Sequence, residues 1–135
     1  MREYIQQFII KIYSRALEHD RAKLEDPELD VFTEYTPKLS EVTYESPEYR
    51  ECLEKMNGAL QHHYAQYRHH PEHFDHGIND MNLIDIVEMF CDWKAASERQ
   101  LDGNLLKSIE KNADRFNMDP QLKQILINTA KVYDE

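Results

Sequence analysis

The sequence predicts an all-α fold, a compact single-domain bundle of about six helices over residues 1–135. Apolar residues recur at helical spacing in long segments, and the alternation typical of strands is absent. Glycine and proline are scarce, with three and five copies, and the prolines lie at the edges of the apolar segments. A chain of this length is large enough for one domain with a single core.

Most of the expected helices have a recognisable start or end. Three begin with a capping side chain followed by proline, in the pairs Asp26-Pro27, Ser46-Pro47 and Asp119-Pro120. Two end before a proline, at Thr36-Pro37 and His70-Pro71, because the residue before proline is disfavoured in the α region.

Apolar periodicity and glycine set the remaining boundaries. An apolar stripe from Ile5 to Ala16 predicts that the first helix faces the core. Gly77 lies in the loop before the fourth helix, and Gly103 lies in the break before the fifth. The expected helices cover about residues 2–22, 27–35, 47–69, 81–100, 103–116 and 120–133.

The composition argues against some classes of partner. The formal net charge is −10 and no basic stripe exists, so neither nucleic acid nor an anionic membrane is an expected partner. No apolar run approaches membrane-spanning length, and Ile9-Ile10 lies among charged residues rather than in a signal peptide. Cys52 and Cys91 lie far apart and are expected to be reduced thiols. A cytoplasmic protein is predicted.

An adjacent histidine and aspartate end the first expected helix. The apolar stripe, continued by one turn, reaches His19, and Asp20 lies on its flank. Such a pair at the inner edge of a helix can offer one nitrogen and one oxygen to a metal ion. The alternative is a histidine hydrogen-bonded in the core beside an exposed aspartate.

Six of the seven histidines fall within residues 62–76. His62 and His63 precede His69 and His70 by seven residues, which is two helical turns. Each histidine is therefore expected to share a helix face with one member of the other pair. The clustering favours a metal or phosphate site, and histidines that merely decorate the surface are the alternative.

The fourth expected helix supplies acidic groups. Asp85, Glu88 and Asp92 fall in a narrow wedge outside a broad apolar arc. The alternative is that this wedge simply faces water. Lys94 points into the middle of the apolar arc, and a buried lysine needs an anionic partner, either a carboxylate or a ligand phosphate.

Several segments together resemble a known family. They are His19–Leu24, Phe32–Leu39, His62–Tyr64, His69–Phe74, Met81–Asp85 and Glu88–Arg99. They are similar to a family of small bacterial and phage proteins classed as a domain of unknown function. The order of a His-Asp pair, further histidines and a late aspartate is in turn similar to the HD phosphohydrolases. Ala22 departs from the serine of the family pattern, and the chain begins too late to include the histidine that family members carry well upstream of the pair.

The resemblance to HD enzymes implies a metal-dependent phosphohydrolase that acts on a nucleotide or another small phosphorylated metabolite. The implied ligands of one or two divalent ions (Mn, Co, Ni, Fe, Zn or Mg) are His19, Asp20, His63, His70 and Asp92. The cations expected to neutralise phosphate oxygens are Lys23, Lys94 and Arg99. Besides Lys23, the candidate catalytic groups, each a general base or an orienter of a ligand histidine, are Glu72, Glu88 and His73.

Two other hypotheses use the same residues differently. A degenerate, non-catalytic HD-like protein would bind a phosphorylated small molecule in the same pocket, or another protein through its acidic surface. Ala22 and the missing upstream histidine favour this hypothesis. A histidine-rich core in which Tyr64 and Tyr67 simply pack would bind nothing. The apolar face of the last helix, from Leu122 to Val132, is compatible with a homodimer, although such a face more often packs in a core.

Overall fold

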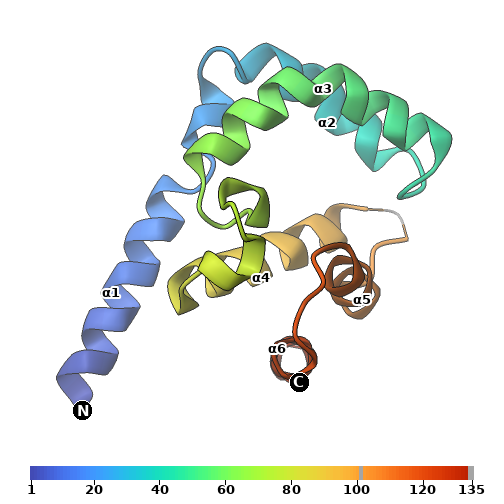
Figure 1. The fold of residues 1–135 in the computed structure, drawn as a ribbon. Helices are drawn as coiled ribbons and strands as arrows, with labels where there is room; N and C mark the ends of the chain where they lie inside the picture. Colours follow the sequence, from blue (N-terminus) through green and yellow to red (C-terminus); the bar gives the residue numbers. More distant parts are fainter. Residues whose placement is uncertain (101, 134–135) are drawn as a thin grey trace.

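The computed structural model describes residues 1–100 and 102–133, and the regular elements within these ranges are all helical. Six α-helices follow one another along the chain (Figure 1): α1 (Arg2–Glu18), α2 (Leu29–Ser40), α3 (Pro47–Gln66), α4 (Leu83–Arg99), α5 (Leu105–Arg115) and α6 (Pro120–Val132). Three short 3-10 helices lie between them: η1 (Arg21–Leu24), η2 (Pro71–His73) and η3 (Gly77–Asp80). The predicted all-α class with about six helices is confirmed.

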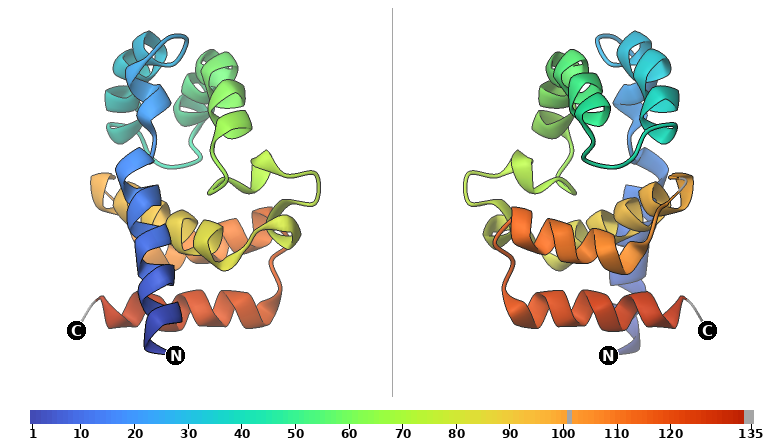
Figure 2. Two further views of the ribbon diagram at one scale, coloured as in Figure 1. Left: turned by 90° about the vertical axis from the view of Figure 1, so that its left-hand side faces the viewer. Right: turned by 90° about the vertical axis from the view of Figure 1, so that its right-hand side faces the viewer.

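Two hydrophobic clusters hold the helices together. The larger joins α4, α5 and α6, and its side chains include Met89 and Ile109, which are fully shielded from solvent. The smaller joins α2 and α3 through Phe32, Met56 and Ala59. Figures 1 and 2 show the α2–α3 pair as an upper layer and α4, α5 and α6 as a lower one. The chain between α3 and α4 runs from the upper layer to the lower one.

Side-chain caps begin four of the described helices, α3, α4, α5 and α6. Ser46 accepts a hydrogen bond (3.1 Å) from a backbone N–H in the first turn of α3, and Asp119 accepts one (2.8 Å) at the start of α6. Asn82 and Asp85 form a reciprocal capping box at the start of α4. These caps satisfy backbone donors that have no partner inside the helix.

The predicted start of the second helix is wrong. α2 begins at Leu29 rather than at Pro27, and Asp26 provides no cap. The physical reason is that the chain turns just before α2 and buries Glu28 completely. This residue faces the interior, where it meets two histidines.

The predicted end of the second helix is also wrong. α2 continues through Pro37 to Ser40, although proline lacks the N–H that a helical hydrogen bond requires. Tyr35 and Leu39 lie on either side of this proline and pack against the α2–α3 cluster. This packing holds the last turn in helical geometry.

Helices α1 and α3 end earlier than predicted. α1 ends at Glu18 rather than at residue 22, because Asp20 adopts a left-handed conformation (φ 56°) through which a right-handed helix cannot continue. α3 ends at Gln66 rather than at residue 69, because Tyr67 is extended. His19 therefore lies in a turn, and the second pair of histidines lies in a loop.

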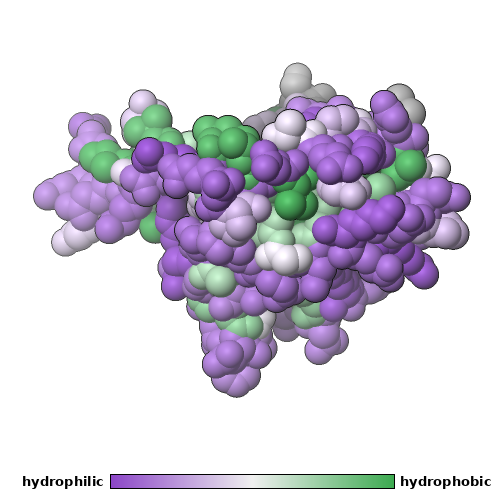
Figure 3. Space-filling model, turned by 90° about the horizontal axis from the view of Figure 1, so that it is seen from above, coloured by the Kyte–Doolittle hydropathy of each residue, from purple (hydrophilic) through white to green (hydrophobic). Residues whose placement is uncertain are grey.

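The prediction that the apolar stripe of the first helix faces the core is wrong. No residue of α1 is buried, and Ile5, Ile9 and Tyr13 are each more than half exposed. The reason is that α1 packs chiefly on α4 and projects beyond it (Figures 1 and 2). The face of the molecule in Figure 3 is mainly hydrophilic and carries separate hydrophobic patches. Within the described ranges, no helix has both the length and the apolar character needed to cross a membrane.

Replacing Met89 by Ala tests the α4–α5–α6 cluster. We expect the free energy of unfolding to fall by about 2–5 kcal/mol, because the change leaves a cavity around a fully buried position. Urea unfolding followed by helical circular dichroism measures it. Leu83, on the same helix but 68% exposed, is the control, and its replacement by Ala should change the same quantity by less than about 0.5 kcal/mol. Equal losses in the two variants would contradict the assignment of this core.

Candidate metal centre

Three separate parts of the chain meet at one polar centre. The turn after α1, the end of α3 with the loop that follows it, and the middle of α4 each contribute side chains. They are His19, Asp20, His63, His69, His70, Glu88 and Asp92. Because α1 and α3 end early, four of these residues reach the centre from turns and loops rather than from helices.

Asp20 and three histidines converge closely enough to bind one ion. One nitrogen or oxygen from each of Asp20, His63, His69 and His70 lies within 4.8 Å of the others. Asp20 Oδ1 is 3.1 Å from His63 Nε2 and 3.6 Å from His69 Nε2. Ligand atoms about 2.1 Å from a tetrahedral ion lie about 3.4 Å from one another. The two distances from Asp20 Oδ1 are close to that spacing.

The same atoms lack hydrogen bonds. Asp20 Oδ1 and the Nε2 atoms of His63, His69 and His70 are buried, and none of them makes a well-aligned hydrogen bond within the described residues, although Asp20 Oδ1 and His63 Nε2 are only 3.1 Å apart. An unsatisfied buried polar atom costs about 1–3 kcal/mol and is therefore rare. Burial and the neighbouring His69 lower the pKa of His70 to about 3, which leaves this imidazole neutral. A cation bound at this centre, with the imidazoles neutral, would satisfy all four atoms.

Glu28 orients His63 from outside this group. Its side chain is fully buried, and its two oxygens accept hydrogen bonds from His62 Nδ1 (2.7 Å) and His63 Nδ1 (2.9 Å). A proton on Nδ1 of His63 leaves its Nε2 with a lone pair facing Asp20. Carboxylates that accept from the outer nitrogen of a histidine in this way hold the ring in place and increase its strength as a metal ligand.

Asp20 takes part in a second group through its other oxygen. Asp20 Oδ2 is 3.3 Å from His19 Nε2, and the same nitrogen is 3.7 Å from Asp92 Oδ1. The ligating atoms of these three side chains again lie within 4.8 Å of one another. Asp20 therefore contributes a carboxylate oxygen to both groups. Paired ions in hydrolytic sites lie about 3.5–4 Å apart.

His19 is surrounded by carboxylates. Hydrogen bonds with Asp20, Asp92 and Glu88 raise the pKa of His19 to about 11. Burial opposes the charge of Glu88, but contacts with His19 and His69 lower its pKa to about 2. Without a metal ion, a protonated imidazole thus balances part of the negative charge at the centre.

Comparison with protein families identifies the chain. A family of unknown function, DUF5662, matches residues 1–132. The chain belongs to DUF5662. The predicted membership of a family of unknown function is confirmed, and no link from DUF5662 to the HD phosphohydrolases is found. A comparison with curated proteins finds no match, and a comparison with solved structures finds none. What this DUF5662 protein does must follow from the chemistry of its own centre.

The structure brings most of the predicted site residues of this DUF5662 chain together. The centre contains His19, Asp20, His63, His70, Glu88 and Asp92. Lys23 lies beside it, because Lys23 Nζ donates a hydrogen bond of 2.5 Å to Asp20 Oδ2. That ion pair places a positive charge next to the oxygen that the second group shares.

Four other predicted site residues belong to none of the metal-binding groups found within residues 1–100 and 102–133. Glu72 instead accepts from an arginine of α5 (2.6 Å), and His73 Nδ1 lies 2.9 Å from a backbone carbonyl of α3. Lys94 is not buried in an apolar arc: its Nζ donates to Glu98 (2.7 Å) and lies 5.4 Å from the ring of a tyrosine after α6. The fourth, Arg99, is exposed at the end of α4.

One member of the centre and one residue that supports it are not predicted from the sequence. Helical spacing pairs His69 with His62 on a continuous helix, but the end of α3 at Gln66 removes that register and turns His69 inward. The sequence places Glu28 at a helix start, where a polar residue after proline is ordinary. The only local signal for His69 was its membership of the histidine cluster, and Glu28 had none.

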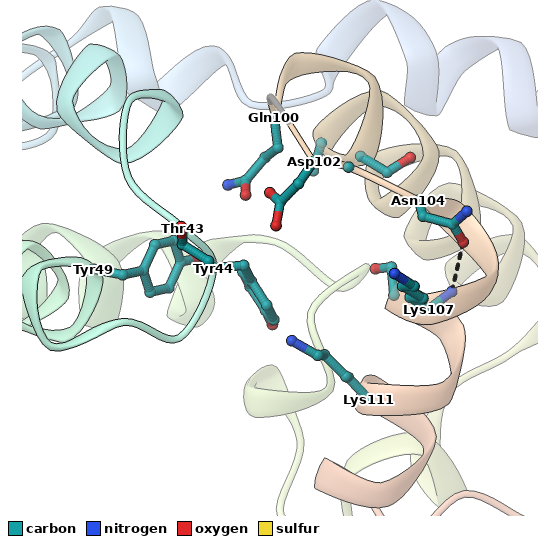
Figure 4. A pocket seen from close by; sticks show the side chains of 12 residues that line it. Thr43, Tyr44, Tyr49, Gln100, Asp102, Asn104, Lys107 and Lys111 are labelled. Atoms are coloured by element: carbon teal, nitrogen blue, oxygen red, sulfur yellow. Dashed lines mark hydrogen bonds between the residues drawn. The ribbon is translucent and has the colours of Figure 1, made fainter.

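A separate pocket of about 330 Å³ lies between the α2–α3 turn and the α4–α5 connection (Figure 4). Its wall includes Tyr44, Tyr49, Lys107 and Lys111. Lys111 is engaged there, since its ammonium lies 3.0 Å from a carboxylate and 4.3 Å from the ring of Tyr44. None of the metal-binding groups found among the described residues lines this pocket. The histidine–carboxylate centre is therefore the candidate functional site.

Replacing Glu28 by Gln tests whether it positions a metal ligand. We expect the affinity for Mn²⁺ or Zn²⁺ to fall about 10–100-fold, because His63 loses the anionic acceptor that orients its ring. Isothermal titration of metal-free protein measures this affinity. Glu34→Gln, which changes an exposed carboxylate of α2 paired with Lys38, should leave it unchanged. A Glu28→Gln protein that keeps its helical circular dichroism and full metal affinity would show that Glu28 only supports the fold.

Proposed function

We propose that this protein is a metal-dependent phosphohydrolase that acts on a nucleotide or another small phosphate ester. The observation that carries the proposal is the set of four buried atoms that face one another without hydrogen bonds, from Asp20, His63, His69 and His70. Fold class gives no support, because the same fold can host unrelated functions. The chemistry of the donor set gives the support.

The donor atoms favour a transition-metal ion at the first group. Three imidazoles and one carboxylate suit Zn, Fe, Co, Ni or Mn better than Mg, which prefers oxygen ligands and retained water. The second group, of His19, Asp20 and Asp92, has more oxygen and would hold a second divalent ion. The order of the His-Asp pair, the later histidines and Asp92 along the chain supports an HD-like site.

Hydrolysis needs a nucleophilic water, charge neutralisation and an acid for the leaving group. A divalent ion bound at the centre supplies Lewis acidity and makes a coordinated water more acidic. The water oxygen forms a bond to phosphorus and gives up one proton, the ester P–O bond breaks, and the leaving oxygen takes up a proton, so that no net proton is gained or lost. Asp20 and Asp92 hold the charge of the centre, and Lys23, which pairs with Asp20 Oδ2, would neutralise a phosphate oxygen of a bound substrate.

The two free cysteines support a reducing compartment, and the net charge supports a small substrate. Both Cys52 and Cys91 are free thiols, as expected of a cytoplasmic protein. The net charge of −10 disfavours a polyanionic macromolecule as substrate, because such a molecule would be repelled over most of the surface.

Metal content is the first test. We expect protein purified without a polyhistidine tag to carry near-stoichiometric transition metal by elemental analysis. Chelation should lower its melting temperature, because an ion that binds only the folded state stabilises that state. Trace metal alone, with no thermal shift on adding Mn²⁺, Co²⁺, Ni²⁺ or Zn²⁺, would exclude a metalloenzyme.

Phosphate release from a panel of nucleotides and sugar phosphates is the second test. The metal-loaded protein should release phosphate, and Asp92→Asn should lower kcat/KM at least about tenfold, because it removes a carboxylate from the second group. Asp75→Asn, at an exposed position, should retain full activity. Bound metal without turnover of any substrate would instead favour the non-catalytic binding protein.

A further inference from the structure

A pocket of about 340 Å³ opens beside the metal centre. Its wall is formed by the end of α1, the turn after it, and the end of α3 with the residues that follow. The charged and aromatic residues that line it are Arg15, Glu18, Arg21, Tyr67, Arg68 and Glu88. A volume of this size falls in the range of sites for small molecules.

Two side chains that line the pocket also contact histidines of the metal centre. Glu88 lines the pocket, and its Oε1 lies 3.1 Å from His19 Nδ1 and 3.3 Å from His69 Nδ1. Tyr67 also lines it, and its ring centroid is 4.6 Å from that of His63. The Tyr67 hydroxyl accepts a 2.6 Å hydrogen bond from the backbone N–H of Ala22, which holds the ring in place. A molecule in this pocket would therefore lie next to the ligand side chains.

Two of the three arginines are held rigidly by carboxylates. Arg15 donates to Glu88 (2.5 Å) and to Asp85 (2.6 Å), and Arg68 makes a two-point contact with Asp85 (3.2 and 3.0 Å). A guanidinium has five N–H donors, so each arginine keeps donors for another acceptor. The side chains remain 29% and 42% exposed, respectively, and both line the pocket.

The third arginine carries its charge without compensation. Arg21 is exposed and forms no ion pair with any residue in the described ranges. The lining of the pocket holds three arginines and two glutamates, and the buried Asp85 behind it pairs with Arg15 and Arg68. The formal charges of these six side chains therefore balance, and Arg21 is the arginine whose guanidinium has no carboxylate partner among the described residues. Guanidinium groups match phosphate oxygens in planar, two-point hydrogen bonds.

We propose that this pocket is the phosphate subsite of the enzyme, in which Arg21 and the anchored Arg15 and Arg68 bind a phosphate group of the substrate. The inference rests on the proposed function, and it names arginines in place of Lys94 and Arg99 as the groups that recognise the substrate. Anchored donors favour this role, because little side-chain freedom is lost when an anion binds. The substrate class is a phosphate ester small enough for the pocket.

Binding of inorganic phosphate to metal-free protein, measured by isothermal titration, tests the subsite. We expect Arg21→Ala to weaken this binding about tenfold, because it removes the uncompensated charge. Arg68→Lys should weaken it as well, because lysine keeps the charge but loses the planar two-point contact. Arg50→Ala, at an exposed position on α3, is the matched control and should bind as the unchanged protein does.

The outcomes separate the subsite from the proposed function. Phosphate binding that is absent, or equally strong in Arg21→Ala and Arg50→Ala, would overturn the subsite even if the protein binds metal. Arginine-dependent phosphate binding in a protein that binds no metal would support the subsite and exclude the hydrolase. With a turned-over substrate, Arg21→Ala should raise KM more than it lowers kcat, because the residue holds a group away from the centre.

Discussion

The buried carboxylate of Asp85 is the constraint on which the arrangement of the centre depends. It has no exposed surface, and a charge in that position is tolerated only with close partners. Arg15 reaches it from α1, Arg68 from the segment after α3, and the backbone N–H of Asn82 from the start of α4. Burial opposes ionisation, but these partners lower the pKa of Asp85 below its ordinary value. One side chain therefore ties together the three segments that supply the residues of the candidate metal centre.

Glu28, in the upper layer, is a second buried carboxylate whose oxygens both have hydrogen-bond partners. Like Asp85 it is completely buried, and both of its oxygens accept hydrogen bonds from histidines of α3. The two carboxylates outside the centre are thus satisfied. Asp20 Oδ1 and the histidine nitrogens around it are not, among the residues described. Glu28 and Asp85 thus have hydrogen-bond partners, whereas the atoms that a cation would bind do not, among the residues described. This contrast distinguishes the centre from an ordinary polar core.

The two hydrophobic clusters explain why the centre lies where it does. One cluster packs α2 against α3 and the other packs α4 against α5 and α6. The polar side chains meet where the end of α3 approaches α4, between the clusters. α1 adds its charged C-terminal turn to that junction and leaves its apolar residues exposed. For α1, ion pairs at the junction count for more than burial of an apolar stripe.

The sequence by itself determined the helical class, two of the three predicted capped helix starts, and the residue types of the centre. Periodicity and capping are local properties, so Ser46 and Asp119 act as their neighbours require. Only the tertiary structure decided where α1 and α3 stop, that His69 joins Asp20, and that Glu28 faces the histidines rather than solvent. It also turned Lys94 toward Glu98 and brought Arg15 and Arg68 to one carboxylate. These choices depend on partners far away in the chain, and spacing along a single helix carries no information about them.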